Sequence, residues 1–271
     1  MQQGAWTAAA GPLGRLSARS AERAVAAQGS RRALERQLPD LAVPPSFRLA
    51  LSRPDVAIIA ELKRRSPSKG ELDLTLDAAV RGAAYERGGA SALSILTEPS
   101  EFDGRIEDIG AARAATTIPL LRKDFIVDEI QLLEARVAGA SAVLLIARAL
   151  PAERFLALAD GARALGLELL LEVRDERELE RALGVPDAVI GVNNRNLETL
   201  QIDDAVSAKL LQLVPSARVA VYESGVRDVD GVRRAAVLGA DAVLVGSALS
   251  VSGSPEMAVR ALTGVPRSPR G

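Results

Sequence analysis

The sequence contains no cysteine and no histidine. These absences exclude disulfides and thiolate metal sites, and they leave no basis for a zinc site built from protein side chains. Histidine, the usual proton shuttle, and cysteine, the usual thiol nucleophile, are both missing. Any acid–base chemistry therefore falls to lysine, glutamate, aspartate or tyrosine. A chain without cysteine also fits a reducing cytosol, so we expect a cytoplasmic protein.

Aromatic residues make up only 3% of the chain, and the net charge is −1. The core must therefore be largely aliphatic, and such a core suits parallel strands that are buried on both faces. A nearly neutral chain has no global attraction to nucleic acid or to a membrane surface, and no apolar run reaches the ~18 residues of a membrane-spanning helix. We therefore expect neither a nucleic-acid partner nor membrane insertion. The length of 271 residues suits one large domain.

One short pattern occurs three times, at Gly89–Leu96, Gly139–Ile146 and Gly239–Gly246. Each copy follows a stretch typical of a helix, begins with Gly-Ala and continues as an apolar run. Glycine suits the left-handed position just after a helix, and the apolar run predicts a strand. The pattern is therefore a repeated helix-to-strand junction.

Further apolar runs predict five more strands, at Val56–Leu62, Pro119–Arg122, Glu168–Val173, Ala188–Val192 and Ala217–Tyr222. Helical periodicity indicates helices between them, including Thr75–Arg87, Glu129–Ala138, Ala152–Leu165 and Asp175–Leu183. Eight strands alternating with helices predict a single-domain α/β protein, a (β/α)8 TIM barrel. The alternative is an open doubly wound sheet, but no Gly-x-Gly-x-x-Gly turn follows the first strand.

The barrel is expected over residues 47–262, after an N-terminal helical extension over 1–46 and before a frayed tail over 263–271. Met1–Leu34 is rich in Ala, Arg and Ser and holds a single acidic residue. That composition resembles a transit peptide, but a surface helix over Arg15–Gln28 is the favoured interpretation.

Polar residues stand at the ends of the predicted strands, where barrel enzymes place their active sites. They are Glu61, Lys63, Thr97, Glu98, Lys123, Asp124, Glu172, Asn193, Arg195, Glu223, Ser224, Gly246 and Ser247. Any one of these residues, taken alone, could equally belong to a structural ion pair or to a functional site. Together they predict a ring of opposite charges that shift one another's pKa values, as acid–base catalysis requires. Arg148 either joins this ring or pairs with acids on the rim.

Glu223–Gly225 and Val245–Ser247 close the last two predicted strands. Small residues there expose backbone N–H groups, and barrels often bind phosphate at this position. The sequence therefore predicts a phosphorylated small-molecule substrate. Ser66–Gly70 is either a mobile loop that closes over ligand or an ordinary turn. Phe125 is either packing or a wall for a flat aromatic group.

Several of these segments together resemble the indole-3-glycerol phosphate synthase family. They are Ile58–Gly70, Leu121–Asp128, Leu171–Val173, Gly191–Leu197 and Glu223–Gly225. The similarity runs from about Phe47 to Leu262. It implies a barrel lyase of tryptophan biosynthesis that needs no metal or organic cofactor and is usually monomeric. The reaction is the conversion of 1-(o-carboxyphenylamino)-1-deoxyribulose 5-phosphate into indole-3-glycerol phosphate, carbon dioxide and water.

The resemblance also implies residue roles. Lys123 is the expected general acid at the ketone oxygen, and Glu172 the expected proton-transfer group of the dehydration. Lys63 would hold the substrate carboxylate and is a second candidate acid, with Glu61 relaying protons. The other implied contacts are Asn193, Arg195 and Glu223 at the ribulosyl hydroxyls, Ser224, Gly225, Gly246 and Ser247 at the phosphate, and Ser66 and Phe125 beside the aromatic ring.

Two positions depart from the family pattern, Arg174 after the Glu172 strand and Tyr222 before Glu223. Neither removes a named catalytic group. The main alternative is another phosphate-binding barrel enzyme such as a phosphoribosyl isomerase, which lacks the paired lysines with Ser-Pro-Ser. A non-catalytic barrel would show decay of the catalytic residues, and none is seen.

Overall fold

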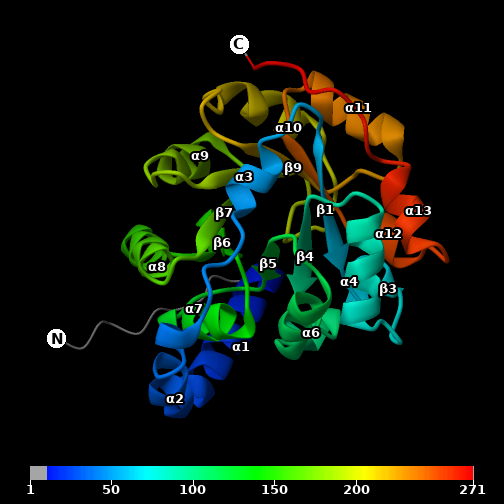
Figure 1. Ribbon diagram of the computed structural model, residues 1–271. Coiled ribbons are helices and arrows are strands. Elements are labelled where there is room, and N and C mark those ends of the chain that lie inside the picture. The colour runs from blue at the N-terminus through cyan, green and yellow to red at the C-terminus, as the bar shows by residue number, and fades with distance from the viewer. Residues whose placement is uncertain (1–10, 271) are drawn as a thin grey trace.

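The fold is a closed barrel, described here by a computed structural model over residues 11–270. Its parallel strands follow the order β1-β10-β9-β8-β7-β6-β5-β4 around the barrel, with helices outside them (Figure 1). The strands are β1 Ala57–Leu62, β4 Ala92–Leu96, β5 Leu120–Lys123, β6 Ala142–Ile146, β7 Glu168–Val173, β8 Val189–Asn193, β9 Ala220–Glu223 and β10 Ala242–Val245. This closed sheet confirms the (β/α)8 prediction, and the open doubly wound alternative is wrong.

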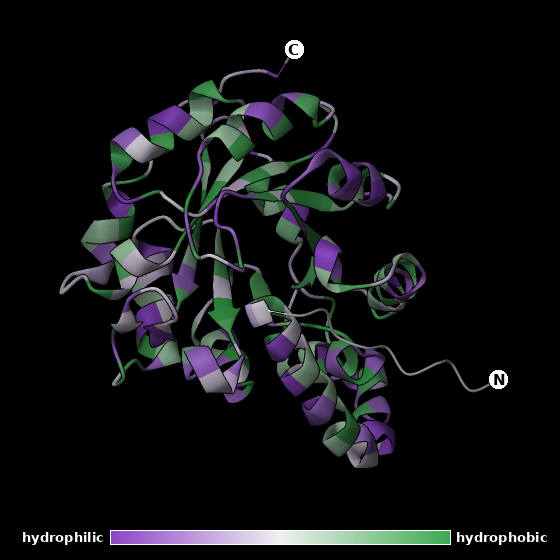
Figure 2. Cartoon of the chain, turned by 180° about the vertical axis from the view of Figure 1, so that it is seen from behind, coloured by the Kyte–Doolittle hydropathy of each residue, from purple (hydrophilic) through white to green (hydrophobic). Residues whose placement is uncertain are grey.

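Each barrel strand is buried on both faces, as the aliphatic composition predicted. Because strand side chains alternate, Ala57 and Ile59 pack inside the barrel with Leu144, while Ile58 packs outside it, in the core between strands and helices. Figure 2 shows this as apolar strands within a ring of helices whose outer faces are polar. The strand ends are thereby held rigidly enough to position a site.

The helices that follow the strands cover the outside of the barrel. They are α4 Ala78–Arg87, α6 Glu107–Ala115, α7 Glu129–Ala138, α8 Ala152–Ala164, α9 Glu176–Leu183, α10 Ala205–Leu210, α11 Val229–Val237 and α13 Pro255–Arg260, with the short α5 Pro99–Phe102 and α12 Ser247–Ser250. Several begin at an aspartate whose carboxylate accepts a backbone N–H. At Asp128, Gln131 completes a capping box. Among residues 11–270, no helix is both long and apolar enough to cross a membrane.

The three repeated junctions are confirmed as helix-to-strand turns. Gly89, Gly139 and Gly239 have φ values of 98°, 98° and 84°. This left-handed backbone costs glycine little because it has no Cβ. Each glycine therefore ends one helix and directs the chain into the next strand.

Before the barrel come α1 Gly11–Ala27, α2 Arg31–Glu35 and α3 Phe47–Leu51. The helix expected at Arg15–Gln28 is present as α1, and the extension contains a second helix, α2, which ends at Glu35. Arg36 and Gln37 keep helical backbone angles, and a short 3-10 turn over Leu38–Asp40 follows them. In Figure 1, α1 and α2 lie together near α7. Residues 1–10 of the transit-peptide-like segment lie outside the described residues.

The C-terminal tail over 263–271 was expected to be frayed, but its residues up to 270 pack on the barrel. Val56 donates its backbone N–H to the carbonyl of Val265 at 2.8 Å. Arg270 is buried and pairs with Asp241 at 2.7 Å, just before β10. The buried Asp241 carboxylate requires cationic partners, and the tail supplies them.

Candidate active site

A cavity of about 300 Å³ opens at the C-terminal end of the barrel. Strand ends, α1 and the loop after β1 line it. The predicted site residues along its wall are Glu61, Lys63, Ser66, Lys123, Phe125, Asn193, Arg195, Glu223, Ser224, Gly225, Gly246 and Ser247. Glu172 does not line this cavity. It borders a small adjoining hollow, and Arg195 and Leu197 line both spaces.

Two lysines converge on one buried carboxylate at the centre of the site. Lys63 Nζ lies 2.6 Å from Glu61 Oε1, and Lys123 Nζ lies 3.9 Å from Glu61 Oε2. Burial disfavours a charged Glu61, but the nearby positive charges, Lys63 foremost, outweigh it and lower the pKa of this carboxyl. Lys63 is hydrogen-bonded to Glu61, whereas Lys123 is held only by charge. The Lys123 ammonium is therefore freer to turn toward a ligand.

The charge on Lys123 is maintained by several acids. Burial alone would lower the pKa of this ammonium. The negative charge of nearby acids, Glu61 foremost, more than offsets that effect, so the pKa of Lys123 is raised. Lys123 is consequently a protonated group at neutral pH, as a proton donor must be at the start of a reaction.

Glu223 behaves differently from its neighbours. Burial, reinforced by the negative charge of Glu172, raises the pKa of Glu223 to about 8. Its side chain reaches toward Gly191 on β8, where an added Cβ would lie 2.0 Å from Glu223 Oε1. With Glu223 neutral, the acids of the cavity lining are Glu61 and Glu101, and the lining lysines and arginines outnumber them. The site is then net positive and suits an anionic ligand.

Asn193 and Ser224 join the ends of β8 and β9. Asn193 Oδ1 accepts hydrogen bonds from Ser224 Oγ and from the backbone N–H of Arg195, both at 2.9 Å. Arg195 in turn donates to the carbonyl of Leu200 at 2.8 Å. These bonds fix the orientation of the Asn193 amide, so its Nδ2 group is directed by the protein rather than by ligand.

The small residues predicted to hold phosphate also line the cavity. Ser224 and Gly225 have consecutive positive φ values of 68° and 99°. Such a backbone is uncommon for serine and turns the chain sharply beside the cavity. Gly246 precedes α12, and an added Cβ there would lie 2.2 Å from Glu61 Oε1. The absence of a side chain at Gly246 thus gives Glu61 its space.

Part of the cavity wall is apolar. Phe125 packs against Phe102, with ring centroids 6.5 Å apart. Leu13 and Leu16 of α1 also line the cavity, and they belong to the same apolar cluster as Phe125. Phe125 is therefore both core packing and cavity wall, which resolves the alternative left open by the sequence.

The loop after β1 forms a small hairpin. Arg65–Ser66, as β2, pairs antiparallel with Gly70–Glu71, as β3. The residues of its tip, with Ser66, line the cavity. The loop is thus part of the site wall rather than an unrelated surface turn.

The sequence did not identify several cavity residues. They are Pro12, Leu13, Arg15, Leu16 and Arg19 of α1, Phe102 after β4, and Leu197, Leu200 and Ile202 after β8. Nothing local distinguishes them, because they reach the cavity through contacts between distant segments. The apolar spacing of Leu13 and Leu16 was the one available signal.

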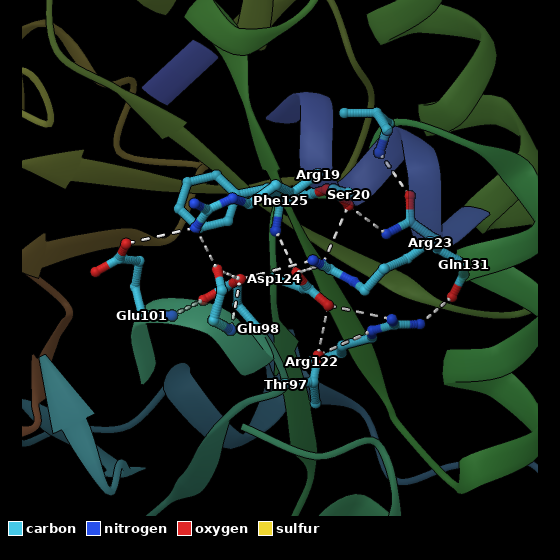
Figure 3. A network of polar contacts seen from close by, with 12 residues as sticks. Arg19, Ser20, Arg23, Thr97, Glu98, Glu101, Arg122, Asp124, Phe125 and Gln131 are labelled. Atoms are coloured by element: carbon cyan, nitrogen blue, oxygen red, sulfur yellow. Dashed lines mark hydrogen bonds and ion pairs between the residues drawn. The ribbon is translucent and has the colours of Figure 1, made fainter. Parts of the chain in front are cut away.

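Some strand-end residues turn away from the cavity. Thr97 donates a hydrogen bond to Asp124, and Glu98 and Asp124 both pair with Arg23 of α1 (Figure 3). Arg148 pairs with Glu178 at 2.6 Å and with Asp175 at 3.2 Å, so it is a rim ion pair. The hydroxyl of Tyr222 donates a hydrogen bond to Asp204 at 2.9 Å, so this hydroxyl has a partner within the protein. Arg174 borders the small hollow beside Glu172.

Comparison with known proteins agrees with this geometry. The sequence model of the family described as indole-3-glycerol phosphate synthase matches residues 16–262. A protein of that name from a Nocardioides species is 51% identical over 82% of this chain and 84% of its own length. Indole-3-glycerol phosphate synthase 2 from Streptomyces coelicolor is 48% identical, over 87% of this chain and 94% of its own.

Solved structures with little sequence identity share the fold. 3-Hexulose-6-phosphate synthase from Salmonella typhimurium superposes with a TM-score of 0.62 at 14% identity and covers 76% of this chain and 96% of its own. A thiamine phosphate pyrophosphorylase from Pyrococcus furiosus gives 0.58 at 19% identity, over 79% and 95% of the two chains. At such identity these likenesses establish the barrel fold alone.

Proposed function

The chain belongs to the indole-3-glycerol phosphate synthase family, and we propose specific roles for the residues at its barrel mouth in that family's reaction. The enzyme is a carboxy-lyase of tryptophan biosynthesis. It closes the ring of 1-(o-carboxyphenylamino)-1-deoxyribulose 5-phosphate and releases carbon dioxide and water to give indole-3-glycerol phosphate. The observation that carries the assignment of roles is the convergence of Lys63 and Lys123 on Glu61 within one cavity.

Ring closure needs a proton at the ketone oxygen as a carbon of the aromatic ring attacks the carbonyl carbon. Lys123 is the donor, because its ammonium is charged and is not hydrogen-bonded to Glu61. Lys63 holds the substrate carboxylate with its ammonium and is a second candidate acid. Glu61 passes protons between the two lysines, which both approach its oxygens. One positioned acid is typically worth ~10²–10⁴ in rate.

Loss of carbon dioxide follows once the ring carbon is tetrahedral, since the released electron pair returns to the ring system. Loss of water then makes the new five-membered ring aromatic, and it requires a base for one proton and an acid for the departing hydroxyl. Glu172 is the proposed proton-transfer group of this step, and its hollow adjoins the main cavity through Arg195. The charge of Glu172 acts on Lys123 and on Glu223, which supports a place for Glu172 beside the groups that line the main cavity.

The remaining groups bind and orient the substrate. Asn193 presents its Nδ2 group to a ribulosyl hydroxyl, with Arg195 and Glu223 beside it. Ser224, Gly225, Gly246 and Ser247 hold the phosphate through backbone N–H and hydroxyl groups, supported by their place at the last two strand ends. Ser66 and Phe125 border the aromatic ring. From the family resemblance alone, we also propose a monomer that acts in the cytoplasm, and light scattering tests the oligomeric state.

Appearance of indole fluorescence from purified protein and the carboxyphenylamino substrate tests the activity. Lys123→Met should lower kcat by about 10²–10⁴-fold while calorimetric substrate binding is retained, because the apolar side chain keeps the volume but has no proton to give. Lys209→Met, at an exposed lysine paired with Glu176, is the matched control and should retain wild-type activity. Turnover that survives in Lys123→Met would remove Lys123 as the general acid.

A further inference from the structure

A buried polar cluster joins α1 to the chain just after β5, outside the cavity. We call Arg23, Glu98 and Asp124 with their hydrogen-bond partners the Asp124 network (Figure 3). Glu98 and Asp124 are buried, and their carboxylates form hydrogen bonds and ion pairs with other residues of the protein. The proposed chemistry uses none of these three residues.

Asp124 is the centre of this network. Its Oδ1 accepts from Arg23 Nη2 and from the backbone N–H of Phe125, both at 2.8 Å. Its Oδ2 accepts from Thr97 Oγ1 at 2.8 Å and from Arg122 Nη2 at 3.2 Å. A buried carboxylate with four donors is fixed in place, because any shift leaves charged groups unpaired.

The neighbours of Asp124 in the chain are the groups that face the substrate. Lys123 and Phe125 line the cavity, whereas Asp124 points the other way and does not. The strand ends at Lys123, so the backbone around Asp124 sets the direction of both side chains. Holding Asp124 therefore holds the proposed acid and the aromatic wall at a fixed separation.

The outer half of the network comes from α1. Arg23 pairs with Asp124 and, at 3.6 Å, with the buried Glu98. One turn earlier, Ser20 Oγ donates to the carbonyl of Phe125 and accepts from Gln131 Nε2. The same helix places Leu13 and Leu16 on the cavity wall. Thus α1 lines the cavity and binds Asp124 and Phe125, the two residues that follow Lys123.

We propose that Arg23 and Asp124 are positioning residues for the reaction, which fix Lys123 and Phe125 and make their placement depend on the docking of α1. This inference rests on the proposed role of Lys123 as general acid. A displacement of about 1 Å at a reacting group can cost about 10²-fold in rate, so loss of the network should be seen in kcat.

The test compares Arg23→Met with Arg154→Met. Arg154 is the matched control, because it reaches the same loop from α8 and pairs with Asp128 at 2.8 Å with a side chain 21% exposed, against 31% for Arg23. We expect Arg23→Met to lower kcat at least about 10-fold with KM within about 3-fold of wild type. Arg23→Lys, which keeps the cation, should recover most of the loss. Arg154→Met should lose thermal stability to a similar extent but keep the wild-type kcat.

A double-mutant cycle tests the pairing itself. Asp124→Asn keeps the shape and removes the charge, and it should lower kcat as Arg23→Met does. The double variant should be no slower than the slower single variant, because both remove one interaction. If Arg23→Met keeps wild-type kcat, or if the two losses multiply, the proposal is wrong. Turnover by the wild-type protein tests the proposed function separately, so the two failures are distinguishable.

Discussion

At the scale of single residues, the site depends as much on missing side chains as on the charged ones. Gly246 and Gly191 stand where a Cβ would meet Glu61 and Glu223 at about 2 Å. Gly191 lies on β8 and Gly246 directly follows β10, and each leaves space that a carboxylate occupies. The space available to each of these carboxylates therefore depends on a glycine in or just after the neighbouring strand.

Gly246→Ala should disrupt the centre of the site. The added Cβ would lie 2.2 Å from Glu61 Oε1 and 2.8 Å from Lys63 Nζ, so the ion pair must shift. We expect kcat/KM to fall by about 10²-fold in steady-state kinetics. Gly253→Ala is the control, since nothing lies within 4 Å of its added Cβ. Equal activity of the two variants would contradict this account of Gly246.

Glu223 gives the protein a predictable pH dependence. Its carboxyl has a pKa of about 8 in the folded protein against an ordinary value of 4.5. Between these values the folded protein holds one more proton than the unfolded chain at this group. The stability that this proton provides is complete below pH 4.5 and is lost as pH rises through 8.

Glu223→Gln, which mimics the protonated acid, should remove that pH dependence. Its free energy of unfolding relative to wild type should therefore rise by on the order of a few kcal/mol between pH 5 and pH 8, measured by urea denaturation. Glu61→Gln is the control, because the pKa of Glu61 is lowered and its contribution changes only below that window. A difference that stays flat with pH for Glu223→Gln would show that Glu223 is ionised in the folded state.

The strand-end rule found most of the site residues but not their directions. Lys63, Lys123 and Glu223 were predictable because each ends an apolar run. The sequence did not show that Asp124 and Glu98 turn outward, because the alternation of side chains breaks down where the strand ends. Which way such a residue points depends on partners such as Arg23, about a hundred positions away in the chain.

At the scale of elements, helix starts carry much of the local order. Asp128 caps α7 and accepts from the backbone N–H of Ile130 at 3.0 Å. It also receives Arg154 at 2.8 Å and Gln28 at 3.0 Å. This helix follows directly on the loop that bears Lys123 and Phe125, so the cap stabilises the segment next to the site.

Asp128→Ala should lower the free energy of unfolding by about 1–2 kcal/mol, because a cap and two side-chain partners are lost together. Thermal or urea denaturation measures the change. Asp160→Ala on the exposed face of α8, where the carboxylate makes only a 3.6 Å contact with Arg163, should stay within about 0.5 kcal/mol of wild type. Equal losses in the two variants would rule out a special role for the cap.

Helices and strands were predicted correctly where the apolar periodicity and the flanking turn residues indicated the same bounds. The strand Glu168–Val173 and the helix Glu129–Ala138 have the predicted bounds, since apolar spacing and flanking turn residues mark both ends. The hairpin after β1 was not predicted, because its strands have only two residues each.

At the scale of the whole molecule, the last residues complete the barrel from outside. Arg270 and Arg267 both pair with Asp241, at 2.7 and 2.9 Å. Arg270 also donates to the carbonyls of Gly239 and Arg218. The C-terminal segment thus links the loops that lead into β9 and β10.

Arg270→Met should lower the free energy of unfolding by about 2–4 kcal/mol, because it removes the more buried partner of a buried carboxylate. Arg267→Met should cost less, since that arginine is more exposed. The order of the two melting temperatures is the decisive observation. If Arg267→Met proves the more damaging variant, then Arg270 does not anchor the tail.

The contacts of α1 have a consequence for the order in which the molecule is built. Arg23 and Asp124 are 101 positions apart, and Ser20 and Phe125 are 105 apart. A ribosome therefore releases α1 long before it has made the surface on which that helix rests. This helix is synthesised before β1, β4 and β5, so its contacts at the mouth of the barrel form only after those strands have been made.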